Sequence, residues 1–202
     1  MANPLYDTLF GRHAGKTTAF LHLEGGVVLT HAGFLGRAAR FAHVLTELGV
    51  KSGDRLAVQI DKSADALALY AACVQAGLVF LPLNPGYTAS EVDYFVGNSG
   101  ARLLVCDPAD VTELTPVAAA AGAAVETMDN TGRGTLRDLA ATLPDTFDTV
   151  DRAAEDLAAF NQHRATEQEE LQRQFLGMNI DHLLLRTNEP YFPEVAKFFR
   201  TR

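Results

Sequence analysis

Apolar residues recur at spacings of three and four in several segments that begin and end at typical helix-capping residues. This spacing places the apolar side chains on one face of a helix. The clearest case runs from Thr30, a capping residue, to Leu48, with Gly49 as the stop. The sequence predicts further helices over residues 4–10, 63–75, 88–98, 108–120 and 135–142. Thr88 and Glu91 have the spacing of a capping box, in which each side chain satisfies a backbone donor of the other.

Short, continuously apolar runs alternate with these helices and predict strands over residues 55–60, 78–81, 103–106 and 123–127. Strands that are apolar on both faces and alternate with helices are typical of an α/β domain with a mainly parallel sheet. Residues 19–30, with Gly25 and Gly26 at the turn, predict a small hairpin before the first long helix. The fold class is therefore α/β, a mainly parallel sheet flanked by helices; the strand order does not follow from this pattern.

The composition changes near Phe160, which predicts a boundary between two segments, 1–159 and 160–202. The first segment carries 29 alanines and a net charge of -8, whereas the second carries 2 alanines and no net charge. The second segment also holds four of the six glutamines and five of the twelve phenylalanines. Within and around it we expect a helix over 151–174, a strand over 182–186 and a final helix over 193–200. We interpret residues 1–159 as a partial α/β domain and residues 160–202 as an unrelated tail.

Composition and charge exclude several classes of function. The 202 residues are 48% hydrophobic and 21% charged, as in a globular chain, and the net charge of -8 argues against a nucleic-acid partner. No apolar stretch approaches the ~18 residues that a membrane span requires, and the first residues lack a secretory pattern, so no membrane partner is expected. Cys73 and Cys106 lie in apolar runs without a CxxC spacing. We expect a cytoplasmic protein with reduced, buried thiols.

Two glycine-rich segments resemble phosphate-binding loops without meeting the requirements of one. Gly11-Arg-His-Ala-Gly15-Lys16-Thr17 has three residues between its glycines, where the working motif has four and follows a strand. We interpret it as a polar connecting loop. Thr131-Gly-Arg-Gly-Thr135 is too short to enclose a triphosphate, and a turn before the next helix explains it.

No other polar residues suggest an active site. The histidines do not have metal-ligand spacing; they are His13, His22, His31, His43, His163 and His182. Asp107, Asp110, Ser63 and Ser90 are interpreted as helix starters, and Cys73 as a packing residue. The sequence therefore assigns no catalytic, cofactor-binding or metal-ligating residue.

Several spaced motifs nevertheless resemble one family in order along residues 4–159. The first motif along the chain is Gly49-Val-Lys-Ser-Gly-Asp54-Arg55, and the longest is Ala76-Gly-Leu-Val-Phe-Leu-Pro-Leu-Asn-Pro-Gly-Tyr87. Two shorter motifs follow, Glu91-Val-Asp-Tyr94-Phe and Leu103-Leu-Val-Cys-Asp107. Together they are similar to the amino-terminal part of the adenylate-forming acyl-CoA synthetases, and within these most similar to malonyl-CoA synthetases. The resemblance implies a truncated amino-terminal subdomain of the adenylate-forming ligase fold.

The resemblance implies a ligase reaction, in which ATP activates a carboxylic acid as an acyl adenylate and the acyl group then passes to coenzyme A. The family uses ATP, Mg²⁺ and coenzyme A, with a Ser/Thr/Gly-rich phosphate loop soon after the segment that matches Asp151–Ala159. Here Phe160-Asn-Gln-His-Arg164 stands in that place. No phosphate, magnesium, ribose or catalytic-lysine position is therefore carried over, no cofactor is expected for this chain alone, and the chain alone is expected to be inactive.

The tail resembles a different family. Residues 177–191, followed by Phe198-Phe-Arg200, are similar to the carboxy-terminal end of bacterial von Willebrand factor A-like proteins. This favours a fusion of two truncated segments. The alternatives to an inactive ligase portion are a non-catalytic binding or scaffold module and a fusion product without a selected function. A cut through a larger α/β domain would expose apolar surface, so self-association or binding to a full-length synthetase is expected.

Overall fold

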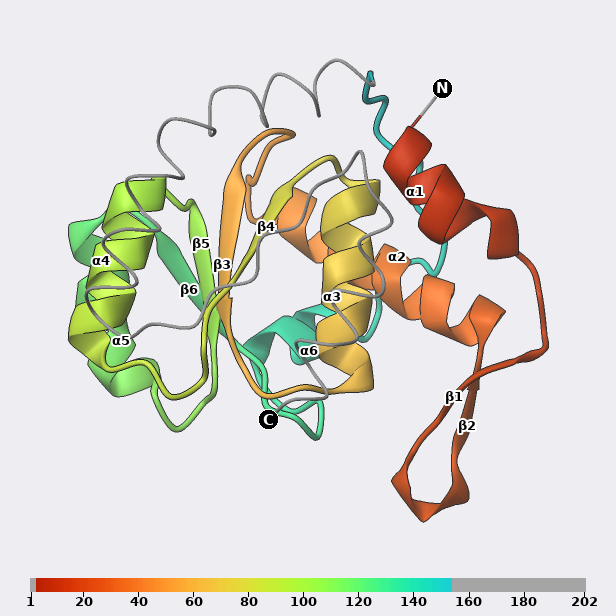
Figure 1. Ribbon diagram of the computed structural model, residues 1–202, viewed down its shortest axis with the longest axis horizontal. Coiled ribbons are helices and arrows are strands. Elements are labelled where there is room, and N and C mark those ends of the chain that lie inside the picture. Colours follow the sequence, from red (N-terminus) through yellow and green to blue (C-terminus); the bar gives the residue numbers. More distant parts are fainter. Residues whose placement is uncertain (1–2, 154–202) are drawn as a thin grey trace, which may run out of the picture. The chain divides into compact units, whose positions relative to one another are not determined.

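The computed structural model describes residues 3–153, in which short helices and strands alternate along the chain (Figure 1). The chain divides into two compact units, Met1–Asp151 and Arg152–Arg202, and the description below concerns the first. The predicted boundary at Phe160 and the elements expected beyond residue 153 lie outside the described residues. Residues 151–153, where a helix was expected to begin, are not helical.

A four-stranded parallel sheet forms the centre of the unit. Its strands are β3 (Arg55–Gln59), β4 (Val79–Pro82), β5 (Leu103–Cys106) and β6 (Ala124–Thr127), in the spatial order β4-β3-β5-β6. β3 pairs with both β4 and β5, with Ala57 opposite Leu81 and Leu104. The predicted α/β class with a parallel sheet is therefore confirmed.

Helices cover both faces of the sheet (Figure 1). α4 (Ala89–Ser99) and α5 (Val111–Ala120) pack on one face, where Val92, Val96 and Leu114 bury Ala57 and Leu104. α2 (His31–Glu47), α3 (Ala64–Gln75) and α6 (Thr135–Ala140) pack on the other, and bury Leu56 and Val58. Alternate residues of β3 thus enter two separate cores, because successive side chains of a strand point to opposite faces.

The amino-terminal segment packs against the second of these cores. The helix α1 (Pro4–Leu9) leads into the 3₁₀ helix η1 (Gly11–His13). The strands β1 (Ala19–His22) and β2 (Val28–Thr30) then form a two-stranded antiparallel sheet. The 3₁₀ turn η2 (Glu24–Gly26) connects them. Tyr6 and Phe10 are buried in the core that α2 and α3 form. The hairpin predicted over residues 19–30 is confirmed.

Local capping explains where most helices begin. The side chains of Thr30, Ser63 and Thr88 each accept a hydrogen bond from a backbone amide of the first turn, and Thr88 and Glu91 form the predicted capping box. Each such cap satisfies an amide that has no partner within the helix. Ser90, predicted as a helix starter, instead lies inside α4, because Thr88 takes that role.

Two predicted helix boundaries are wrong. The helix expected over 108–120 begins at Val111, because Asp107 accepts a hydrogen bond from Ala109 N at 2.8 Å and closes a turn over residues 107–110. Asp110 occupies the capping position without a side-chain capping bond. The helix expected to reach Thr142 ends at Ala140.

Candidate functional site

The topology singles out one edge of the parallel sheet. After β3 the chain crosses through α3 to β4, and after β4 it crosses back over the other face to β5 on the opposite side of β3. In open α/β sheets, ligands bind outside the carboxyl ends of the strands where the direction of winding changes. That place lies between the ends of β3 and β5, and the loops after β4 and β6 flank it.

Gln59 ends β3 and holds the loop that follows β4. Its Nε2 donates to the carbonyl oxygens of Asn84, Pro85 and Tyr87, at 3.2, 3.4 and 2.8 Å. The residue is only 3% exposed, and its Oε1 accepts no hydrogen bond from the described residues. The side chain therefore ties the Pro-Gly loop to the central strand, a role that the sequence analysis missed because nothing local marks a strand glutamine as a clamp.

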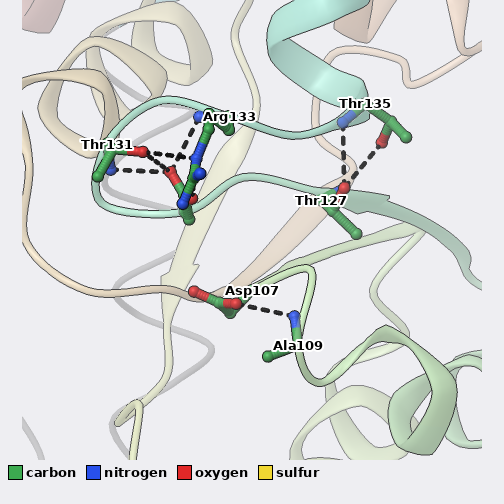
Figure 2. Close-up of polar contacts among 7 residues, drawn as sticks. Asp107, Ala109, Thr127, Thr131, Arg133 and Thr135 are labelled. Carbon is green, nitrogen blue, oxygen red and sulfur yellow. Dashed lines mark hydrogen bonds and ion pairs between the residues drawn. The ribbon is translucent and has the colours of Figure 1, made fainter.

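The loop after β6 is organised by Asp129 (Figure 2). Its carboxylate accepts hydrogen bonds from Thr131 N and Oγ1 and from Arg133 N and Nε, at 2.7–3.0 Å. The Thr131 hydroxyl is the largest cause of a lowered Asp129 pKa, followed by the Arg133 amide. Burial opposes this shift without reversing it, so the aspartate is charged at neutral pH. Thr131–Thr135 is thus a structured turn, as predicted.

A pair of threonines closes the base of the same loop. Thr127 N donates to Thr135 Oγ1 at 2.9 Å, and Thr135 N donates to Thr127 Oγ1 at 3.0 Å (Figure 2). Gly134 lies between them with φ +133°, a conformation that favours glycine. The reciprocal bonds fix the entry into α6.

Asp65, at the start of α3, is a buried carboxylate that lies between two arginines. Its Oδ1 lies 2.7 Å from Arg37 Nη1 of α2 and 3.9 Å from Arg137 Nη1 of α6. Gly132 approaches so closely that a Cβ there would overlap the Asp65 carboxylate. This carboxylate therefore joins three elements and has no free side for a substrate.

The thiols do not provide a nucleophile. Burial, together with smaller contributions from Asp110 and Asp107, raises the pKa of Cys106 at the end of β5 to about 12. Burial also raises the pKa of Cys73 in α3. Because the thiolate is the reactive form, both residues are unreactive at neutral pH, and the interpretation of Cys73 as a packing residue agrees with its full burial.

The sequence motifs lie apart from this edge. The Gly11–Thr17 loop follows helix α1 rather than a strand, and three of its amides donate to nearby carbonyls: His13 N to Phe10 O, Ala14 N to Gly11 O and Lys16 N to His13 O. It is therefore a connecting loop with no free row of amides for a triphosphate.

Four of the histidines lie among the described residues, and one of them, His22, is exposed at the end of β1. His13 stacks on His31, and His43 lies 2.8 Å from the Thr146 carbonyl with its ring against Phe147. His163 and His182 lie outside the described residues. Over residues 3–153, no group of three or more His, Cys, Asp or Glu side chains could hold a metal ion. No helix in the same range is long and apolar enough to cross a membrane.

Comparison with known proteins places this architecture in one family. MatB from Rhodopseudomonas palustris has a similar structure, with a TM-score of 0.74 and 41% identity; the match covers 78% of this chain and 32% of MatB. A benzoate CoA ligase from Burkholderia xenovorans LB400 shares the fold at 22% identity and a TM-score of 0.63, over 76% of this chain and 31% of that one. A feruloyl-CoA synthase from Amycolatopsis is 37% identical over 108 residues, 54% of this chain and 22% of the synthase.

The chain thus spans about a third or less of the length of these relatives. The likeness of residues 177–200 to von Willebrand factor A-like proteins gains no support from these comparisons. The family model for AMP-binding enzymes matches residues 10–190, most of the chain. On this match, and on the parallel sheet it shares with MatB, the chain belongs to the AMP-binding enzyme family.

Proposed function

We propose that the chain forms the amino-terminal portion of an ATP-dependent acid–CoA ligase of the malonyl-CoA synthetase type. The observation that carries this is the 41% identity to MatB over 78% of the chain, joined to a TM-score of 0.74. The relatives that are named as CoA synthases and ligases agree on the reaction class. In that class a carboxylate attacks ATP, pyrophosphate leaves, and the thiol of coenzyme A then displaces AMP from the acyl adenylate.

The described residues supply a framework rather than the reacting groups. The carboxylates of Asp65 and Asp129 are bonded to arginines of the same unit, both thiols are buried, and three amides of the Gly11–Thr17 loop are paired with nearby carbonyls. These residues do not fit a magnesium–ATP site, and we derive no catalytic step from them. Phosphoryl chemistry depends on preorganised phosphate contacts and a metal. The 202 residues alone are therefore proposed to be inactive.

A graft tests the proposed function directly. Residues 1–151 replace the corresponding segment of MatB, and malonyl-CoA formation is measured alongside MatB itself. We expect a folded chimera whose kcat/KM lies within about tenfold of MatB, because the segment supplies packing and loop positions and not the reacting groups. A folded chimera without any activity would contradict the assignment.

The inactivity of the chain alone has a separate assay. Pyrophosphate release is followed with ATP, Mg²⁺, malonate and coenzyme A, and we expect the rate of a protein-free blank. Turnover above the blank that purifies with the chain would refute the inactivity and leave the family assignment intact.

A second candidate, a non-catalytic binding module, rests on exposed apolar surface. In the described part of the chain β4 and β6 form the two edges of the sheet, and Val27 and Val28 at the hairpin are 58% and 47% exposed. Sheet edges and exposed apolar side chains favour association with another chain. Sedimentation velocity over a concentration series should show self-association, or a complex with an added full-length synthetase; a monomer that binds neither would exclude this candidate.

A further inference from the structure

A group of basic side chains gathers where the loop after α1 meets the start of α2. Ala32 N donates to the Lys16 carbonyl at 2.8 Å, and His31 N donates to the Thr18 carbonyl at 3.1 Å. These bonds hold the loop against the helix. They bring the rings of His13 and His31 parallel, with centroids 4.7 Å apart and planes 11° from one another.

The group carries positive charge without a carboxylate to balance it. Lys16 Nζ donates a hydrogen bond to His13 Nδ1 at 3.1 Å, and neither Lys16 nor Arg12 forms an ion pair within residues 3–153. Asp7, the acidic residue of α1, accepts a hydrogen bond from the Asn3 amide. By contrast, Arg37, Arg40 and Arg133 each have an aspartate partner.

The cost of gathering these charges is visible at His13. Desolvation lowers its pKa, and the positive charges of Lys16, His31 and Arg12 lower it further. These charges oppose protonation of the His13 ring, and a bound anion would offset them and favour its protonated form.

The surroundings leave room for an anion only on the outer side of the rings. A cavity of about 50 Å³ adjoins His13 and His31, and its other lining side chains include Phe10, Phe20 and Phe34. This lining offers no hydrogen-bond donor besides the two imidazoles. Arg12 and Lys16 are exposed on the loop, where a guanidinium can donate two parallel hydrogen bonds to an oxyanion and an ammonium can add a point charge.

We propose that Arg12, His13, Lys16 and His31 form a binding site for a tetrahedral dianion, the phosphate of a phosphate monoester. The proposal goes beyond the proposed ligase function, and the site uses none of the residues at the carboxyl edge of the sheet. Binding is coupled to protonation of His13, so an anion of constant charge such as sulfate binds more strongly below the pKa of His13 than above it, whereas a phosphate monoester, with a second pKa of about 6, also loses charge at low pH.

The test uses the full 202-residue chain and follows the histidine ring signals by NMR from pH 5 to pH 8.5. Inorganic sulfate is the probe for pH dependence because its charge stays constant over this range, and inorganic phosphate is the second probe. Measurements are made at low ionic strength, since a Debye length of about 10 Å at 0.1 M salt would screen the site. Chloride and acetate at equal ionic strength serve as reference anions.

We expect saturable shifts of the His13 and His31 signals with sulfate and phosphate, and a His13 pKa raised by about half a unit or more. His43 lies elsewhere on α2 and serves as an internal reference whose ring signals should not respond to either probe. The double variant Arg12→Gln/Lys16→Gln should bind both probes at least about tenfold more weakly, whereas Lys51→Gln, which removes an exposed lysine before β3, should bind normally.

The proposal would be overturned if sulfate and phosphate act on His13 no more than chloride or acetate. It would equally be overturned if the double variant, with unchanged His43 signals as evidence of folding, binds the probes like the unaltered chain.

Discussion

Replacing Gly134 with alanine should destabilise the fold far more than replacing any glycine that merely has a positive φ. Gly134 has φ +133° and ψ 168°, a region that residues with a Cβ rarely enter. An alanine Cβ there would overlap the Thr127 carbonyl oxygen and lie 2.6 Å from its carbon and 2.9 Å from Met128 N. These are backbone atoms of β6 and the residue after it, so no side-chain rotation relieves the overlap.

The size of the effect follows from three contributions. The backbone conformation costs about 1–3 kcal/mol. Moving the loop away would also break the reciprocal Thr127–Thr135 hydrogen bonds of 2.9 and 3.0 Å, at about 1 kcal/mol each. The free energy of unfolding should therefore fall by about 4 kcal/mol, which corresponds to a Tm lower by about 10 °C for a domain of this size.

Gly122→Ala is the matched control. Gly122 has φ +73°, and nothing lies within 4 Å of a Cβ built on it. Only the cost of a left-handed residue remains, about 1 kcal/mol. Both variants are compared with the unaltered chain by urea unfolding followed by circular dichroism. If Gly134→Ala loses no more stability than Gly122→Ala, the close approach of the two backbone segments is refuted.

Three further predictions follow from the loops and the cores. Asp129→Asn should destabilise the chain most above about pH 4 and progressively less at lower pH, because folding lowers the Asp129 pKa from 3.8 and the stabilisation is lost as the carboxylate protonates. Urea unfolding over a pH series measures the difference in stability between the variant and the unaltered chain. A difference that widens on acidification would contradict the prediction. Cys73 and Cys106 should react with Ellman's reagent at pH 8 at least about 100-fold more slowly in the native chain than in guanidinium, because burial raises the pKa of both thiols. Equal rates in the two conditions would show that the thiols are accessible in the native chain. Thr88→Ala should cost about 1 kcal/mol through loss of the cap of α4, whereas Ser90→Ala should be nearly neutral; urea unfolding that reverses this order would place the cap at Ser90.

The local signals in the chain were sufficient for most of the elements. Caps at Thr30, Ser63 and Thr88, and the glycines after the helices, act within one helical turn, so their effect can be recognised without knowing the fold. The wrong helix boundaries also have a local origin. The helix expected from Pro108 was displaced because the Asp107 side chain bonds to Ala109 N, and a turn competes with a helix over the same few residues.

The arrangement of the polar residues could not be recognised in the same way. Gln59 and the loop at Asn84 are 25 residues apart, and Asp65 and Arg37 are 28 residues apart. No periodicity or motif links such positions. Likewise, no spacing along the chain indicates that His13 stacks on His31, because the hairpin of residues 19–30 separates them.

The sequence by itself determined the α/β class, the succession of elements and the family, since each depends on local patterns and ordered motifs. Only the tertiary structure decided the strand order β4-β3-β5-β6, the partners of the buried carboxylate and the meeting of the basic side chains. The physical reason is that strand pairing and ion pairing join residues distant in the chain. Their free energy depends on how whole elements pack, and not on the residues beside them in the sequence.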